Sequence, residues 1–231
     1  MDFEVEIAAV RRHTASYATD PQFRTYWLGF TRESRNLRAQ QLRAFGELVG
    51  SVTTTLSGWR ILDVGCGDGR WLRSLLELDP KPEDLIGIDA SDVRFETGRA
   101  KNPLISLMKT DGKTIPFEDG YFDLVTQIVC FSNVPTAGFR KHIAAEIRRV
   151  VKRGGFIFWW DLSHTTTPAD PNVDLHPSDF FDWPIRQLAI GEMPRCSECL
   201  RPSVLRYLLT PILDRFGYPR THVAALIGPK G

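Results

Sequence analysis

The segment Ile61–Arg70, with the sequence ILDVGCGDGR, constrains the fold of this chain more than any other. Its three apolar residues, at positions 61, 62 and 64, predict a short buried strand, and a helix is expected to begin near its last residue. The glycines between this strand and this helix let the backbone turn sharply and approach a ligand, because they carry no Cβ. The N–H groups at the start of the helix would point at that ligand. The alternating glycines are Gly65, Gly67 and Gly69.

Asp63 stands at the end of the predicted strand, where a carboxylate could bind a cationic ammonium group. A turn that offers a carboxylate suits an amino-acid-like ligand better than a bare phosphate. Dinucleotide-binding folds use the different spacing G-x-G-x-x-G, in which the glycines serve a pyrophosphate. The spacing here is D-x-G-x-G-x-G, which resembles the first motif of class I S-adenosylmethionine-dependent methyltransferases.

Three more segments resemble this family and follow the first in the family's order. Leu85–Asp89 (LIGID) is a short apolar strand that ends in an acid, which can accept hydrogen bonds from both hydroxyls of a ribose. A later stretch resembles the one in which an acid and a small residue, here Asp111 and Gly112, contact adenine. Residues 144–155 resemble the helix and turn before the fifth strand, which is expected at Phe156–Asp161.

Some of these residues also have simpler interpretations. Asp89 could cap a helix that begins near Ser91, and Asp111 could be an ordinary turn acid. Cys66 lies between motif glycines and is interpreted as a small residue in a tight turn, not as a nucleophile. The pair Gly154–Gly155 is expected to close the preceding helix at its C-terminus.

The resemblance spans residues 61–161 and implies both a fold and a cofactor. The implied fold is α/β, a Rossmann-like class I methyltransferase sheet of seven strands whose last strand is antiparallel, with an N-terminal helical cap. The implied cofactor is S-adenosyl-L-methionine, which leaves S-adenosyl-L-homocysteine as product. The residues expected to bind it are Asp63, Gly65, Gly67, Gly69, Asp89, Ala90, Asp111, Gly112 and Gln127.

The chain has 231 residues, enough for one sizeable α/β domain. We expect a single methyltransferase domain over 1–231: a helical cap at 1–57, a cofactor-binding core at 58–162, and an acceptor-side part at 163–231 with a loop, helices and a final strand. Within the cap, a helix is predicted around 35–49, because apolar residues recur there at helical spacing. Its apolar face would carry Leu42, Phe45, Leu48 and Val49, with Leu37 at the margin.

The C-terminal part departs from the family pattern. A helix is expected near Phe180–Leu188 and another over Ser203–Phe216, and the final strand at Thr221–Ile227. The sixth strand of the family should lie between the first of these helices and the final strand. Gly191–Pro202 is poorly hydrophobic, so this strand is either short or replaced by a structure remodelled over the active site.

Composition narrows the class of protein. There are 29 Lys and Arg against 28 Asp and Glu, so the net charge of +1 gives no reason to expect a nucleic-acid partner. We see no secretory signal and no apolar run of membrane-spanning length, and expect a cytoplasmic protein that does not associate with membranes. The pair Cys196–Cys199 lacks the further ligands of a zinc site, so we expect no metal.

The methyl acceptor is expected at the carboxyl ends of the fourth and fifth strands, where ligands bind in open α/β sheets. We expect a small molecule, bound by Asn133 and by Tyr17 and Tyr26 of an aromatic segment that could close over it. His164 is a candidate base for a hydroxyl acceptor, because histidine side chains exchange protons near neutral pH, and Asp161 is the second catalytic candidate.

The expected function is methyl transfer to an oxygen or nitrogen of a small molecule, such as a sugar or a secondary metabolite. The alternatives are a nucleic-acid or protein methyltransferase, an NAD-binding oxidoreductase, or a scaffold that binds the cofactor without turnover. An oxidoreductase would explain the glycine turn and Asp89, but neither Asp63 nor the Asp111–Gly112 pair. Amino-methylating nucleic-acid enzymes typically carry an Asn/Asp-Pro-Pro-Tyr/Phe motif after the fourth strand, which Phe131–Pro135 (FSNVP) does not match.

Overall fold

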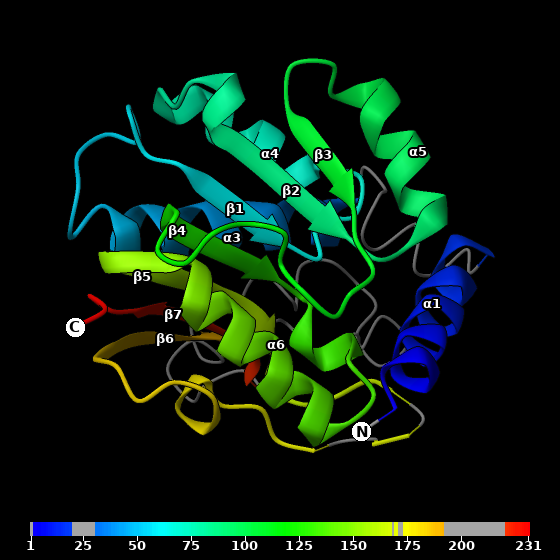
Figure 1. The fold of residues 1–231 in the computed structure, drawn as a ribbon. Coiled ribbons are helices and arrows are strands. Elements are labelled where there is room, and N and C mark those ends of the chain that lie inside the picture. Colours follow the sequence, from blue (N-terminus) through cyan, green and yellow to red (C-terminus); the bar gives the residue numbers. More distant parts are fainter. Residues whose placement is uncertain (1, 20–30, 168, 171–172, 192–219) are drawn as a thin grey trace, which may run out of the picture.

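The computed structural model describes residues 2–19, 31–167, 169–170, 173–191 and 220–231. These residues form a seven-stranded sheet with the strand order β3-β2-β1-β4-β5-β7-β6 (Figure 1). Neighbouring strands from β3 to β5 are parallel, whereas β7 pairs antiparallel with both β5 and β6. The predicted seven-stranded sheet with an antiparallel last strand is therefore confirmed. The strands are β1 (Ile61–Val64), β2 (Leu85–Asp89), β3 (Ser106–Lys109), β4 (Phe122–Ile128), β5 (Val151–Leu162), β6 (Ile185–Gly191) and β7 (Arg220–Ile227).

Helices connect the strands, and the expected N-terminal helices are present as α1 and α3. Two helices begin at a threonine cap: Thr31 accepts a hydrogen bond from the Ser34 N–H before α3, and Thr136 from the Phe139 N–H before α6. The helices are α1 (Phe3–Thr19), α3 (Arg32–Val49), α4 (Arg70–Leu75), α5 (Asp92–Lys101) and α6 (Ala137–Val150). The 3-10 turns are η2 (Leu76–Leu78), η3 (Pro82–Asp84), η4 (Phe131–Asn133) and η5 (Pro177–Asp179).

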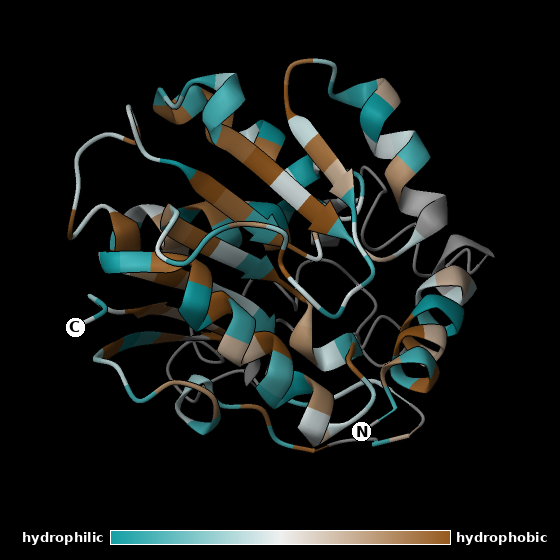
Figure 2. Ribbon diagram, viewed as in Figure 1, coloured by the Kyte–Doolittle hydropathy of each residue, from teal (hydrophilic) through white to brown (hydrophobic). Residues whose placement is uncertain are grey.

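Both faces of the sheet are apolar and covered, because successive strand residues point to opposite sides. On one face, buried side chains of β1, β4 and β5 pack with those of α6. On the other face, α3 and α4 cover the sheet, and the ring of Phe45 lies 5.1 Å from that of Trp71 and 5.0 Å from that of Phe158. Figure 2 shows the apolar residues concentrated along β1 and β2. The central strands are thus fixed from both sides, and their carboxyl ends point toward α1 (Figure 1).

The expected helix near Phe180–Leu188 is wrong, because the last four of these nine residues belong to the sixth strand and the first five are not helical. β6 covers Ile185–Gly191 and pairs with β7, with Ile185 opposite Ile227 and Ile190 opposite His222. Its backbone hydrogen bonds come from a partner more than thirty residues away in the sequence, so the local pattern did not reveal the strand. The final strand is confirmed, and the helix expected over 203–216 lies outside the described residues.

Two smaller expectations are also wrong. The pair Gly154–Gly155 does not close α6, which ends at Val150. The pair lies inside β5, where Gly154 has a φ of 78° and its N–H donates to the carbonyl of Lys230 (2.8 Å). In α3, Leu37 is buried whereas Leu42 is 41% exposed. The buried face of α3 is rotated relative to the predicted one, because Leu42 faces the cavity described below and not the sheet.

Candidate cofactor and acceptor site

The glycine turn between β1 and α4 adopts the backbone conformation that its sequence predicts. Gly65, Gly67 and Gly69 have φ values of 75°, 57° and 69°, in the left-handed region that glycine adopts without strain. A Cβ on Gly65 would lie 2.9 Å from the sulfur of Cys130, and one on Gly69 would lie 2.9 Å from the amide nitrogen of Asn102. Glycine is therefore required at both positions for conformation and for space.

Asp89 joins the glycine turn to the end of β2. One carboxylate oxygen accepts the N–H of Gly67 (2.8 Å), and the other accepts the N–H of Ser91 (2.7 Å). The second contact is a local turn before α5, whose N-cap is Ser91, so Asp89 does not itself cap that helix. A carboxylate oxygen can accept more than one hydrogen bond, so the group is suited to the two hydroxyls of a ribose.

Asp63 lies buried at the end of β1 and lines the same cavity. The hydroxyl of Thr126 donates to its Oδ1 (2.8 Å). Burial raises the pKa of Asp63 to about 8, an effect that the Thr126 hydrogen bond opposes and the nearby charge of Asp89 strengthens. A cationic group beside Asp63 would favour the ionised form, so the site is suited to a ligand that carries an ammonium group.

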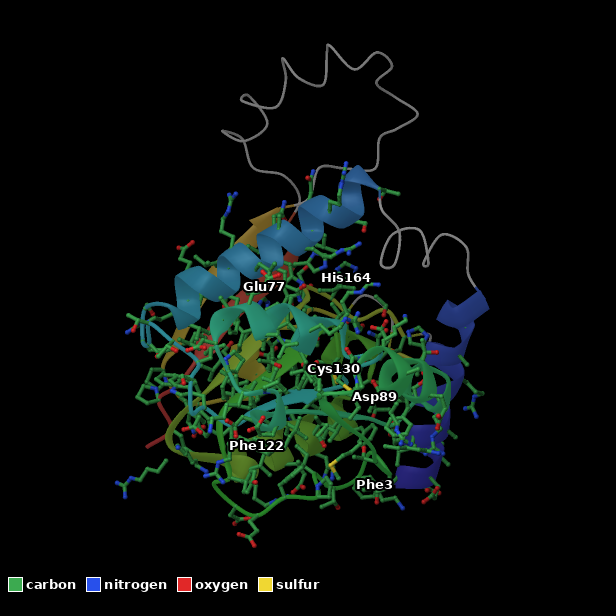
Figure 3. All side chains as sticks on the ribbon, turned by 90° about the horizontal axis from the view of Figure 1, so that it is seen from above. Phe3, Glu77, Asp89, Phe122, Cys130 and His164 are labelled. Carbon is green, nitrogen blue, oxygen red and sulfur yellow. The ribbon has the colours of Figure 1, made fainter. Side chains whose placement is uncertain are left out.

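A cavity of about 670 Å³ opens at the carboxyl ends of β1, β2 and β4. Figure 3 shows Asp89 and Cys130 beside each other on the side of the sheet that faces α1. α1 forms one wall with Ile7, Val10 and Thr14. Its Arg11 donates to the carbonyl of Ala90 (3.0 Å), so α1 is fixed directly over the end of β2.

The wall between α1 and α6 is suited to a flat ring. Gly112, Thr114, Ile115, Ile143 and Glu146 line it, and a Cβ on Gly112 would lie 3.3 Å from Ile7. Asp111 itself is exposed, and its Oδ1 accepts the N–H groups of Lys113 (2.9 Å) and Thr114 (3.2 Å). The acid of the predicted adenine pair thus shapes the turn, and the glycine reaches the cavity.

The structure does not bring every predicted residue to the cavity. Asn133 and Ala90 line it, whereas Gln127, Asp161 and His164 are not part of its described wall. Gln127 and Asp161 are fully buried. Their oxygens hold the turn after β4: Gln127 accepts the N–H of Cys130 (3.2 Å), and Asp161 accepts that of Phe131 (2.8 Å).

The remaining predicted residues have no described contact with the cavity. The Nδ1 of His164 lies 3.4 Å from the hydroxyl of Ser163, and its charge contributes to lowering the pKa of His222, although burial is the larger cause. Tyr17 lies in the last turn of α1, and Tyr26 lies outside the described residues. Most of the aromatic segment expected to close the site also lies outside them.

Several residues that line the cavity were not predicted from the sequence. Val129 and Cys130 come from the turn after β4, and Arg38 and Gln41 come from α3. The helical spacing of polar residues within the otherwise apolar face of α3 was the available signal. Burial raises the pKa of the thiols of both Cys66 and Cys130, which keeps them protonated and agrees with a structural role.

Within the described ranges, no group of three or more His, Cys, Asp or Glu side chains is placed to hold a metal ion, and Cys196 and Cys199 lie outside those ranges. No helix in the part of the chain that the structure describes is both long and apolar enough to cross a membrane.

Comparison with known proteins relates part of the chain to methyltransferases. Residues 61–155 match the family model described as a methyltransferase domain. A demethylmenaquinone methyltransferase of Staphylococcus saprophyticus is 32% identical over 145 residues, which are 61% of this chain and 60% of that protein. The chain thus spans less than two thirds of the length of this curated relative.

Solved structures share the fold at low sequence identity. One is a chain of the complex between the Haloferax volcanii Trm112 methyltransferase activator and a methyltransferase, with a TM-score of 0.64 and 18% identity over 96% of this chain and 98% of that one. Another is an S-adenosylmethionine-dependent methyltransferase from Archaeoglobus fulgidus, with a TM-score of 0.57 and 18% identity over 90% and 99%. At these identities the two structures show that the chain shares their fold, and the match to a methyltransferase domain covers residues 61–155 of it.

Proposed function

We propose that this chain transfers a methyl group from S-adenosyl-L-methionine to a small molecule. The observation that carries the proposal is that Asp63, Asp89 and Gly67 line one cavity at the ends of β1 and β2. Each is suited to a different part of this cofactor: a carboxylate for the ammonium, a carboxylate for the ribose hydroxyls, and bare backbone for close approach. The match of residues 61–155 to a methyltransferase domain supports the same cofactor.

The bound cofactor would supply a methyl group that is already activated, because it is attached to a sulfonium. The chain's own task is to hold donor and acceptor in line and to exclude water. Asp63 would bind the ammonium, and the Asp89 carboxylate would accept the ribose hydroxyls. Gly112 lets α1 lie close to the turn after β3, because a Cβ there would crowd Ile7, so that α1 covers the cavity that would hold the cofactor.

We place the methyl acceptor between α3 and the turn after β4. Leu37, Leu42, Val129 and Leu162 line this part of the cavity, with Asn133 and Thr166 as its polar groups. An apolar wall with a few polar groups favours an acceptor with an apolar body over a sugar. The name of the Staphylococcus relative, a demethylmenaquinone methyltransferase, supports the same preference. Methylation at oxygen or nitrogen of another metabolite is the alternative.

A hydroxyl acceptor would need a base, and we propose His164 for that role. It follows β5 by two residues, and the neighbouring Leu162 and Thr166 both line the cavity. Its ring would have to turn from Ser163 toward the cavity to reach a substrate. An acceptor that needs only alignment would leave His164 without a part in the reaction.

Calorimetric titration tests the cofactor assignment directly. The purified chain should bind S-adenosylhomocysteine and should not bind NAD. Asp89→Ala should weaken this binding by about 1–3 kcal/mol, because it leaves polar groups of the ligand unpaired. Exposed Asp182→Ala is the matched control and should bind like the parent. Equal affinity of Asp89→Ala and the parent would contradict the placement of the ribose.

The acceptor can be sought with the same protein. Incubation with S-adenosylmethionine that carries a labelled methyl group, together with small quinones, phenols, amines and sugars, should give a labelled product that mass spectrometry detects. Label in a quinone or phenol would support an apolar acceptor. Label found only in sugars, or only in added RNA or protein, would contradict it.

A further inference from the structure

A buried arginine on α6 connects the two segments that carry the polar groups of the acceptor wall. Arg140 is 2% exposed and does not belong to the described wall of the cavity. Its Nη1 donates to the carbonyl of Val134 (2.8 Å), the residue after Asn133, and its Nη2 forms an ion pair with Asp170. One guanidinium thus ties the turn after β4 to the segment that follows β5.

We call the segment after β5 the acceptor loop, and its described residues are 163–167, 169–170 and 173–175. Two backbone hydrogen bonds join its ends, one of them from the Thr165 N–H to the carbonyl of Val173 (2.9 Å). Asp170 lies between these ends. Its carbonyl accepts a hydrogen bond from the hydroxyl of Thr165, and its carboxylate pairs with Arg140. The arginine is therefore the contact that fixes this part of the loop to the rest of the protein.

Thr166 places the acceptor loop against the turn after β4. Its N–H donates to the carbonyl of Ser132 (2.9 Å). Its hydroxyl oxygen lies 3.0 Å from the same carbonyl oxygen and 3.3 Å from the Oδ1 of Asn133. Thr166 and Asn133 both line the cavity. A shift of the loop would therefore change the spacing of the two polar groups that the proposed function assigns to the acceptor.

The pair between Arg140 and Asp170 is a poor source of stability. Removing a guanidinium and a carboxylate from water costs free energy that their attraction repays only in part, so apolar residues of similar size are often as stable. What the pair supplies is direction, because the planar guanidinium donates along fixed lines. The side chain of Asp170 is still 28% exposed, so water would solvate it without the arginine, and the loop would lose this anchor.

We propose that Arg140 is a positioning residue for the methyl acceptor. Through Asp170 it holds the acceptor loop, so that Thr166 and Asn133 keep the spacing at which they bind the polar group of the acceptor. The inference rests on the proposed function, because it deepens the assignment of that acceptor wall. Arg140 touches neither ligand, and its partners belong to the turn after β4 and to the acceptor loop, so its effect should fall on the acceptor and not on the cofactor.

Hydrogen exchange, followed by NMR on the ligand-free protein, tests the first step. In Arg140→Met, the amides of Thr165 and Thr166 should exchange at least about tenfold faster than in the parent, because the loop opens more often. The amide of Val125, in β4, should exchange as in the parent. The double variant Arg140→Met/Asp170→Leu replaces both charges by apolar groups and should melt within about 4 °C of the parent.

Methyl transfer tests the second step, with the compound that takes up the methyl label as the acceptor. In Arg140→Met and in the double variant, kcat/KM for this acceptor should fall about 10- to 100-fold, because small misplacements of a positioning group cost that much. The affinity for S-adenosylhomocysteine in calorimetry should stay within about twofold. Arg140→Lys keeps the charge but not the planar fork, so its kcat/KM should be intermediate.

Lys141→Met is the matched control, because Lys141 is the next residue on α6, is exposed and does not line the cavity. Its loop amides, its kcat/KM and its affinity for S-adenosylhomocysteine should all equal those of the parent. The control therefore separates the loss of any cation on α6 from the loss of the pair with Asp170.

Three results would overturn the role of Arg140. Unchanged exchange at Thr165 and Thr166 in Arg140→Met would show that the loop is fixed without the pair. Normal kcat/KM in a variant whose loop amides exchange faster would show that the acceptor does not depend on the loop. Equal losses of kcat/KM and of affinity for S-adenosylhomocysteine would mean that Arg140 only supports the structure. A parent that binds no S-adenosylhomocysteine would instead overturn the proposed function, and the exchange result would still decide whether Arg140 holds the loop.

Discussion

Val129 adopts a backbone conformation that its side chain disfavours. Its φ of 53° lies in the left-handed region, which costs an L-residue about 1–2 kcal/mol and a β-branched residue the most. Hydrogen bonds hold it there: its N–H donates to the carbonyl of Trp160 (2.7 Å), and its carbonyl accepts from the amide of Asn133 (2.6 Å). Strain of this kind is kept where a site needs a fixed shape, and Val129 lines the cavity.

Two substitutions measure this strain. Val129→Gly and Val129→Ala both remove the branched side chain, but only glycine accepts the backbone angles. Val129→Gly should therefore be the more stable of the two by about 1 kcal/mol in chemical denaturation. Gly46→Ala in α3 is the control, and there alanine should be more stable than glycine. Its Cβ would meet nothing within 4 Å, and alanine favours helices. A less stable Val129→Gly would show that the turn is not strained at this residue.

The sequence predicted some residues of the site and missed others for a physical reason. Gly67 and Asp89 were predicted because their roles depend on local backbone angles and on strand ends, which a short motif encodes. The conformation of Val129 depends on Trp160 and Asn133, so no local pattern predicts it. Arg38 lies 25 residues before Asp63, and the packing of α3 against β5, β6 and β7 brings it to the cavity.

Hydrogen bonds to Asp161, near the end of β5, hold the turn between β4 and α6 in place. Asp161 is buried, and its Oδ2 accepts the N–H groups of Phe131 (2.8 Å) and Ser132 (3.3 Å) at the start of η4. Its Oδ1 accepts the N–H of Leu162 (2.8 Å). Three backbone donors meet one carboxylate, so the arrangement fits a positioning role better than a catalytic one.

Asp161→Asn separates these roles. An amide group cannot accept hydrogen bonds on both of its heavy atoms, so at least one buried N–H would lose its partner. The free energy of unfolding at pH 7.5 should fall by about 1–3 kcal/mol. Exposed Asp182→Asn is the control and should leave stability unchanged. A variant as stable as the parent, with normal affinity for S-adenosylhomocysteine but slow turnover, would instead support the catalytic role expected from the sequence.

Strands could be predicted from the sequence where neighbouring residues mark them. β1, β2 and β7 were predicted because apolar runs and turn residues mark them. β6 was missed, since it is an edge strand whose only strand partner in the described sheet, β7, is distant in sequence. The glycine pair in β5 was misassigned for a similar reason, because its role depends on Lys230.

At the scale of the whole molecule, burial makes stability depend on pH. Asp63 has a pKa of about 8 in the folded chain, well above its ordinary value, because burial disfavours its charge. The pKa of Asp161 is raised to about 6, also by burial, and that of His222 is lowered to about 4 by burial. Between pH 6.5 and 7.5 the lowered pKa of His222 and the raised pKa of Asp161 still act in opposite directions, so the contribution of Asp63 is best measured against a variant that lacks only its charge.

Between pH 6.5 and 8, Asp63 binds a proton in the folded chain but not in the unfolded chain. The Asp63 contribution therefore falls as the pH rises, by up to about 1.4 kcal/mol per pH unit, and it levels off above pH 8. Urea denaturation at several pH values should show it as a difference between the parent and Asp63→Asn, which mimics the protonated carboxyl and keeps the other titrating groups. The parent should lose stability relative to this variant as the pH rises. Saturating S-adenosylhomocysteine should reduce this relative decline, because its ammonium group would ionise Asp63 in the folded chain and lower its pKa. A parent with the same pH dependence as Asp63→Asn from pH 6.5 to 8 would contradict a protonated Asp63. A relative decline that persists in the presence of the ligand would contradict the pairing of Asp63 with the ammonium.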